Sequence, residues 1–258
     1  MALAFDEYGP KDGLAIVLLH GAGTSGWMWR KQVEELAPDF HVLVPDLPGH
    51  GRSNRYPWIS IPDTAARIAD LISAHSTARR AHVVGLSLGG YVALQLAAAA
   101  PEVLSGATVS GVNVLPFPHA GGMRLLGWLM APFLTFGPIL RANARSLNVP
   151  AEEFDGYRTA ANAMTRRAFI KVNDEAVRFR IPTGAEHSAC PVLAVAGENE
   201  HDLVRRSLVQ IAMAFPQGQG RLVPGVGHAW NGEKPELFSA MVRSHVTGGP
   251  LPPELEGP

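Results

Sequence analysis

The stretch GLSLGG, residues 85–90, connects the apolar run AHVVGL (81–86) to the alanine-rich run YVALQLAAAA (91–100). The first run predicts a buried strand and the second a helix, so the pattern G-x-S-x-G falls on a sharp strand-to-helix turn. A turn this tight requires a strained backbone at Ser87 and leaves no room for a Cβ on either flanking glycine. The Ser87 hydroxyl is therefore predicted to stand above the sheet edge, where the helix dipole favours developing negative charge.

Further short apolar runs alternate with helical periodicity on both sides of this turn. This alternation is typical of strand–helix units around a mostly parallel central sheet with flanking helices, which is the α/β class. The predicted strands are AIVLLH (15–20), FHVLVPD (40–46), AHVVGL (81–86), GATVSG (106–111), PVLAVAG (191–197) and RLVP (221–224).

The alternation stops between residues 115 and 189. The part of this segment up to Leu140 holds one charged residue, Arg124, whereas the remainder is charged and helical in pattern. We therefore predict a core made of residues 1–114 and 190–258, with a helical cap over 115–189 inserted between two strands. The apolar stretch from Leu125 to Leu140 is shorter than the about 20 residues that span a bilayer, so no membrane span is predicted.

The bulk composition excludes several kinds of partner. The chain has 258 residues, 47% of them hydrophobic and 17% charged, with a net charge of −1 and no basic stripe, so nucleic acid is not expected as a partner. Its one cysteine, Cys190, cannot form an internal disulfide, and the N-terminus lacks a signal-peptide pattern, so a cytoplasmic location is expected. No metal-ligand cluster or dinucleotide fingerprint is present, and no cofactor is predicted. The oligomeric state is not predicted.

The motifs together resemble the α/β-hydrolase family over nearly the whole chain. HGAGTSGWMW follows the first strong strand, DLPGHGRS the second, GLSLGG the third, and GVGHAWN lies near the end. The resemblance implies an esterase-like enzyme with Ser87 as nucleophile and His228 as general base. It also implies that the backbone N–H groups of Ala22 and Leu88 form the oxyanion hole. His20 is expected to brace the loop that carries Ala22.

The acid that orients the histidine must be chosen from the sequence GENEHD, residues 197–202. Asp202 begins an apolar-faced helix, where an aspartate would cap free N–H groups. The resemblance places the acid three residues after the glycine that ends the strand, which is Glu200, although aspartate is the usual residue there. Glu200 is therefore the first choice and Asp202 the second, with Glu198 also open.

These residues predict a serine hydrolase of the carboxylesterase type that cleaves small-molecule esters with an apolar portion through an acyl-enzyme on Ser87. Four cap residues could line an apolar pocket above the serine, or could simply pack the cap onto the core: Trp128, Met130, Phe133 and Phe136. Arg166 and Arg167 could bind a carboxylate or form a solvated helix face. The alternatives are a C–C bond hydrolase or hydroxynitrile lyase with the same residues, and a non-catalytic small-molecule receptor.

Overall fold

The computed structural model describes residues 3–133 and 135–258, without the side chains of Met123 and Met130. Its seven strands form one sheet in the order β1-β3-β2-β4-β5-β6-β7, in which all pairs are parallel except β1 with β3. The strands are β1 (Phe5–Tyr8), β2 (Ala15–Leu19), β3 (His41–Pro45), β4 (Ala81–Leu86), β5 (Leu104–Ser110), β6 (Val192–Gly197) and β7 (Gly218–Val223). The predicted α/β class with a mostly parallel sheet is confirmed.

The strand β1 was missed by the sequence analysis. Its four residues, FDEY, contain no apolar run, and three of them are only half-buried. It forms by antiparallel pairing with β3, with Phe5 opposite Pro45. Edge strands of this kind depend on their neighbour rather than on local pattern. The sixth predicted strand begins at Gly218, three residues earlier than predicted. The prediction started late because the first residues of this strand are polar or glycine and form no apolar run.

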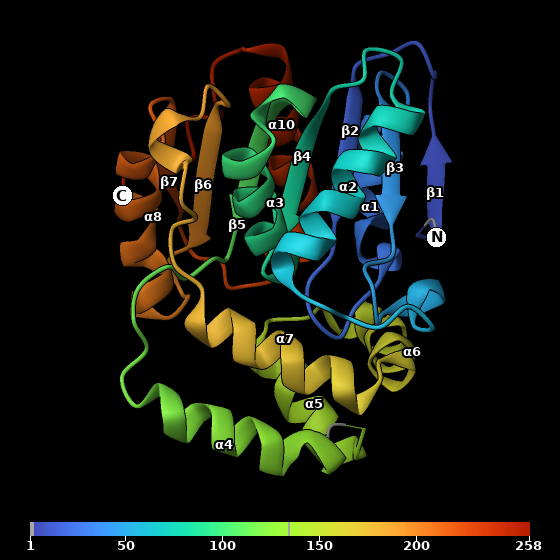
Figure 1. Ribbon diagram of the computed structural model, residues 1–258, viewed down its shortest axis with the longest axis vertical. Helices are drawn as coiled ribbons and strands as arrows, with labels where there is room; N and C mark the ends of the chain where they lie inside the picture. The colour runs from blue at the N-terminus through green and yellow to red at the C-terminus, as the bar shows by residue number, and fades with distance from the viewer. Residues whose placement is uncertain (1–2, 134) are drawn as a thin grey trace.

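Helices cover both faces of the sheet, which explains why β2, β3, β4 and β6 are buried along their whole length. One face packs against α2 (Ile61–His75), α3 (Leu88–Ala99) and α8 (Asp202–Ala214), and the other against α1 (Arg30–Leu36) and α10 (Pro235–Thr247). In β2, Val17 and Leu19 belong to the first core, whereas Ile16 and Leu18 belong to the second. Figure 1 shows α2 and α3 in front of the sheet and α10 behind it.

Four α-helices lie between β5 and β6 in the described residues, and we call them, together with the segments that join them, the inserted helices. They are α4 (Ala120–Met130), α5 (Gly137–Ser146), α6 (Phe154–Ala163) and α7 (Arg166–Arg178). Figure 1 shows them gathered at the carboxyl ends of the parallel strands. Glu175 on α7 fastens them to the core, because its carboxylate accepts hydrogen bonds from Trp58 Nε1 at 2.6 Å and from the Ile61 amide at 3.2 Å.

Two histidines, one buried and one partly buried, share a hydrogen-bond partner in the core. His82 on β4 and His245 on α10 both hydrogen-bond Thr108 Oγ1 at 2.9 Å. Burial lowers the pKa of His245 to about 4, and burial together with the charge of His245 lowers the pKa of His82 well below its usual value. Both histidines are therefore neutral in the folded state at pH values where they are protonated in the unfolded chain.

We expect the free energy of unfolding to fall as the pH drops below about 6.5, because the unfolded state then binds more protons. For His245 alone the loss between pH 7 and pH 5 should be roughly 2 kcal/mol. Urea unfolding at the two pH values should show this loss, and it should be smaller in His245→Asn. The matched control is His187→Asn, at an exposed histidine, which should lose as much as the wild type. Equal losses in all three proteins would contradict the prediction.

Candidate active site

Ser87 occupies the turn between β4 and α3 with a left-handed φ of 54°. The backbone is packed so closely on both sides of Ser87 that neither flanking glycine could carry a Cβ. A Cβ on Gly85 would lie 2.2 Å from the Gly89 carbonyl oxygen, and a Cβ on Gly89 would lie 2.1 Å from that of Leu19. The Ser87 amide donates to the Ser110 carbonyl at 2.8 Å, which ties the turn to β5. The backbone strain is thus maintained by the surrounding sheet.

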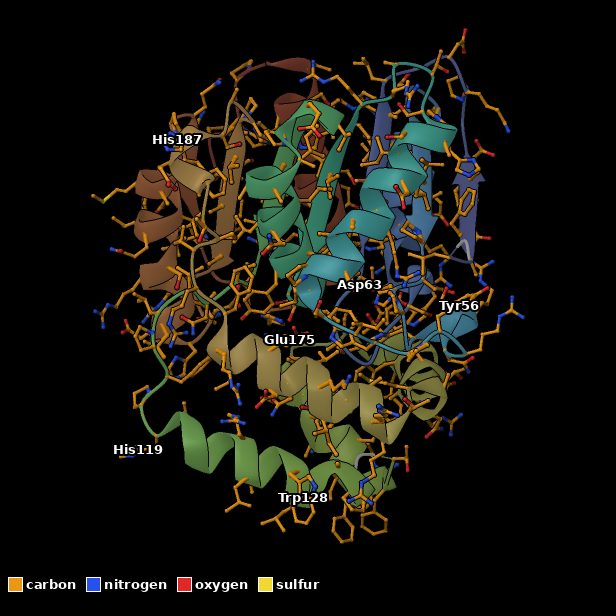
Figure 2. The ribbon with its side chains drawn as sticks, viewed as in Figure 1. Tyr56, Asp63, His119, Trp128, Glu175 and His187 are labelled. Atoms are coloured by element: carbon orange, nitrogen blue, oxygen red, sulfur yellow. The ribbon has the colours of Figure 1, made fainter. Side chains whose placement is uncertain are left out.

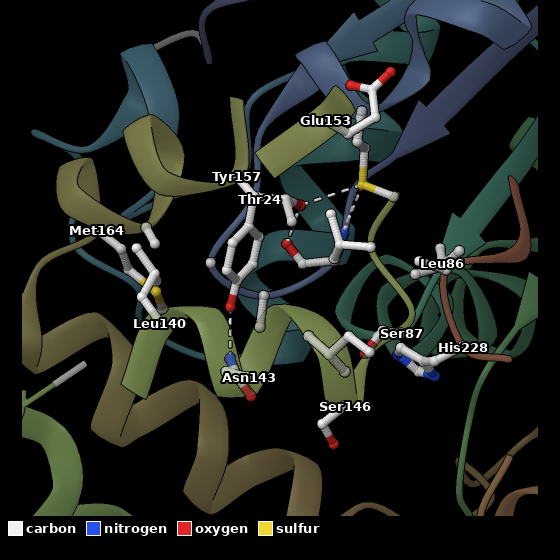
Figure 3. A pocket seen from close by; sticks show the side chains of 18 of the residues that line it. Thr24, Leu86, Ser87, Leu140, Asn143, Ser146, Glu153, Tyr157, Met164 and His228 are labelled. Atoms are coloured by element: carbon white, nitrogen blue, oxygen red, sulfur yellow. Dashed lines mark hydrogen bonds between the residues drawn. The ribbon is translucent and has the colours of Figure 1, made fainter. Parts of the chain in front are cut away.

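His228 follows β7 and lies next to Ser87 in the wall of the same cavity (Figure 3). Its Nδ1 is 2.6 Å from Glu200 Oε2. The Glu200 side chain is only 2% exposed, and its other oxygen accepts from the Gly197 amide at 3.1 Å. A carboxylate accepts hydrogen bonds only, so Nδ1 carries the proton and Nε2 remains the basic nitrogen.

Two backbone N–H groups beside Ser87 are available to a ligand. Within the described residues, the amides of Ala22 and Leu88 donate to no protein acceptor. The loop that carries Ala22 is braced by buried His20, whose Nε2 accepts from the Leu47 amide at 2.9 Å and whose Nδ1 donates to the Gly21 carbonyl at 2.9 Å. Burial lowers the pKa of His20, which keeps the ring neutral in this role.

The cavity next to Ser87 has a volume of about 830 Å³ and lies between the sheet and the inserted helices. Its wall is mainly apolar. Among the apolar lining residues are Met28, Leu86, Ile139, Leu140, Leu147, Val149, Met164 and Phe169. Polar residues line it as well, among them Lys31, Glu153 and Arg166, and two others pair with one another, since Asn143 Nδ2 donates to Tyr157 Oη at 2.5 Å (Figure 3). Such a site suits a small molecule with an apolar portion.

A serine at a strained turn, a histidine held by a buried carboxylate and two unpaired amides define an arrangement for acyl transfer. Residues 16–241 of the chain match the model of the alpha/beta hydrolase family. The chain belongs to this family. It is therefore a hydrolase of the α/β-hydrolase superfamily.

Individual relatives agree with this assignment. An AB hydrolase superfamily protein from Gibberella zeae is 30% identical over 255 residues, covering 95% of this chain and 84% of the relative. A pimeloyl-(acyl-carrier protein) methyl ester esterase from Yersinia pseudotuberculosis is 40% identical over 91 residues, covering 35% of this chain and 33% of the relative. The crystal structure of a thermophilic esterase from Thermogutta terrifontis superposes with a TM-score of 0.79 at 23% identity, covering 95% of this chain and 93% of that one, and so shares the fold.

The other two acids of the GENEHD segment contact different groups in this α/β-hydrolase. Asp202 begins α8, is exposed, and lies 3.5 Å from Arg205 and 3.6 Å from Arg206. It does not cap the helix, because the His201 side chain accepts from the Leu203 amide instead. Glu198 accepts from the Gly225 amide at 2.8 Å. Of the three acids, Glu200 is the one that contacts His228.

Two groups that hold the His228 loop were not found from the sequence. The Gly227 amide donates to Glu233 Oε1 at 3.0 Å, and the Ala229 amide donates to the Leu147 carbonyl of the inserted helices at 3.0 Å. The residues on both sides of His228 are thus fixed, one by α9 (Trp230–Glu233) and one by the end of α5. The sequence does not predict these contacts, because each involves a backbone amide or carbonyl and every residue has such groups.

The expected pocket residues of the inserted helices are mostly elsewhere. Trp128, Phe133 and Phe136 are 52%, 51% and 60% exposed and do not line the cavity, so their predicted role is wrong. The side chain of Met130 lies outside the described residues. Arg166 does line the cavity. The inserted helices expose these large side chains, and residues such as Ala131, Ile139 and Leu140 line the cavity instead. The apolar composition of the segment could not show which of its side chains face the cavity and which face solvent.

The described residues contain no group of three or more His, Cys, Asp or Glu side chains arranged to hold a metal ion. Among the helices of residues 3–133 and 135–258, none combines the length and apolar character needed to cross a membrane.

Proposed function

We propose that this α/β-hydrolase is a serine carboxylesterase that cleaves esters with an apolar portion. The observation that carries the proposal is the 2.6 Å contact between His228 Nδ1 and the buried carboxylate of Glu200, next to a serine whose backbone is strained. A histidine oriented in this way is a base for a hydroxyl nucleophile. Ser87, His228 and Glu200 then form the catalytic triad.

In the proposed mechanism, His228 Nε2 takes the proton of the Ser87 hydroxyl as its oxygen attacks the ester carbonyl carbon. The Ala22 and Leu88 amides donate to the oxyanion that forms. The C–O bond to the alcohol then breaks, and the alcohol leaves with the proton from His228. Water, deprotonated by His228, then attacks the acyl carbonyl carbon. The bond from that carbon to Ser87 Oγ breaks, His228 returns the proton to Oγ, and the carboxylic acid leaves. Glu200 stays ionised and stabilises the imidazolium at each step.

The inserted helices are proposed to act as the cap that selects the substrate. They supply the apolar side chains Ile139, Leu140, Met164 and Phe169 to the cavity wall, which favours an aliphatic or aromatic acyl or alcohol group. The name of the relative from Yersinia pseudotuberculosis, a methyl ester esterase, supports an ester as the substrate class.

A panel of substrates tests the proposal. Purified protein is expected to hydrolyse p-nitrophenyl esters of short and medium acyl chains, with saturation kinetics. Under the proposed mechanism, which begins with serine attack on an ester carbonyl, it should leave a vinylogous keto acid and a cyanohydrin unchanged. Cleavage of the keto acid or the cyanohydrin without ester hydrolysis would replace the proposal by C–C bond chemistry. Binding of these compounds with no turnover of any of them would indicate a receptor.

A further inference from the structure

The helix α4 packs with its small side chains inward and its large apolar side chains outward. Gly127 lies against Asn173 of α7, Ala131 just beyond the helix is buried, and Arg124 forms an ion pair with Asp174. The opposite side and the turn that follows expose six large apolar side chains, each 50 to 60% exposed. We call this set the outer apolar face, and it consists of Leu125, Leu126, Trp128, Leu129, Phe133 and Phe136. Figure 2 shows Trp128 at the surface farthest from the sheet.

This orientation is the reverse of that of an ordinary amphipathic helix, which buries its large apolar residues and exposes polar ones. Exposed apolar side chains are common singly, but a contiguous set indicates a surface that binds something. Six of the eleven most exposed large hydrophobic residues in the described part of the chain belong to the outer apolar face. The six side chains of the outer apolar face come from the apolar stretch LLGWLMAPFLTFGPIL, and they belong neither to the core nor to the cavity wall.

The outer apolar face is the far side of the cavity wall. Ala131, Pro132 and Thr135 line the cavity, whereas Phe133 and Phe136, between and beside them in the chain, are exposed and do not line it. A surface that contacts these two phenylalanines therefore lies within a few residues of the proposed substrate site.

The charge around the outer apolar face selects the kind of partner. Residues 103–151 contain no Asp or Glu but include Arg124, which pairs with Asp174, and the exposed Arg141 and Arg145. Asp174 and Glu175 of α7 lie near Leu125 and Trp128, but Asp174 pairs with Arg124 and Glu175 accepts from Trp58. The Arg141 guanidinium lies beside Gly137, next to Phe136, and so borders the face. The segment 115–189 holds nine Lys and Arg against six Asp and Glu, in a chain whose net charge is −1. A second copy of this chain would bring the same arginines against one another, whereas an anionic surface complements them.

We propose that the outer apolar face docks on an anionic lipid surface. Leu, Phe and Trp side chains would enter the boundary between headgroups and acyl chains, and Arg141 and Arg145 would lie at the level of the lipid phosphates. The protein then lies on the surface without spanning it. One consequence rests on the proposed ester hydrolysis: the substrate class includes long-chain esters dissolved in lipid.

Vesicle flotation tests docking independently of catalysis, because it can use the Ser87→Ala protein. Vesicles of phosphatidylcholine mixed with phosphatidylglycerol are expected to bind the protein, and pure phosphatidylcholine vesicles should bind it less. The triple change Trp128→Ser, Phe133→Ser and Phe136→Ser should weaken binding about tenfold or more, since it removes the apolar contact. The matched control is Met213→Ser, at a methionine 79% exposed on α8, which should bind like the parent protein.

The triple change in the Ser87-containing enzyme should leave hydrolysis of a soluble short-chain ester unchanged and slow hydrolysis of a long-chain ester held in vesicles. Absence of binding to anionic vesicles, or equal binding by the triple variant, would overturn the docking proposal and leave the esterase proposal standing. Light scattering provides a third outcome. A dimer that the triple change converts to monomers would assign the face to a second copy of the chain and overturn docking on lipid.

Discussion

Ser87→Ala is expected to lower kcat for a p-nitrophenyl ester by roughly 10⁶-fold, the scale of loss for a nucleophile that acts as one unit with its base. The change removes the oxygen that forms the acyl-enzyme. The amides of Ala22 and Leu88 remain, so a small residual rate over water is expected. Steady-state kinetics and far-UV circular dichroism would show the loss of activity in a folded protein.

A second serine in the cavity wall provides the matched control. Ser146, the last residue of α5, lines the cavity but lies outside the strained turn that carries Ser87, so Ser146→Ala should keep kcat within a few-fold. A fluorophosphonate should label Ser87 alone in the wild type and nothing in Ser87→Ala, as peptide mass spectrometry would show. Labelling of another residue, with activity that survives the change, would mean that the turn is structural only.

The turn at Ser87 and the residues that meet around it could be predicted from the sequence, because steric limits on the backbone fix the turn and the sheet topology brings the other residues to it. The glycines around Ser87 are required by contacts near 2 Å that any strand-to-helix turn of this shape would create. Parallel strands bring their carboxyl ends to one edge of the sheet, so residues that follow β4, β6 and β7 meet in space. This is why Ser87, Glu200 and His228 could be chosen from three distant segments, with the spacing of Glu200 supplied by family resemblance.

The inserted helices were less predictable for a physical reason. Composition indicates that a segment is apolar, but it does not indicate which side of a helix faces the protein when both sides are apolar. Gly127 and Ala131 face inward and Trp128 and Phe133 face outward, the opposite of what size and hydrophobicity favour. The contact of the Leu147 carbonyl with the loop of His228 was invisible for a different reason, because a backbone carbonyl is present in every residue.

The Glu200 carboxylate gives the sharpest test of the proposed triad. In the structure Oε1 accepts from the Gly197 amide and Oε2 from His228 Nδ1. In Glu200→Gln the carbonyl oxygen of the new side chain can replace Oε1, which turns its NH₂ group toward Nδ1. Nδ1 must then accept, the proton moves to Nε2, and the ring can no longer take a proton from Ser87.

Loss of the correct tautomer in the serine-protease template costs about 10⁴-fold in kcat, so Glu200→Gln should lose activity on that scale while keeping its melting temperature close to that of the wild type. Asp202→Asn is the matched control, because it removes a carboxylate two residues away that contacts only exposed arginines. It should cost about 1 kcal/mol or less in stability, with kcat within a few-fold. Glu198→Gln keeps an acceptor for the Gly225 amide and should change neither quantity. If Asp202→Asn lowers kcat by orders of magnitude and Glu200→Gln does not, then the contact seen at His228 is not the one that catalysis uses.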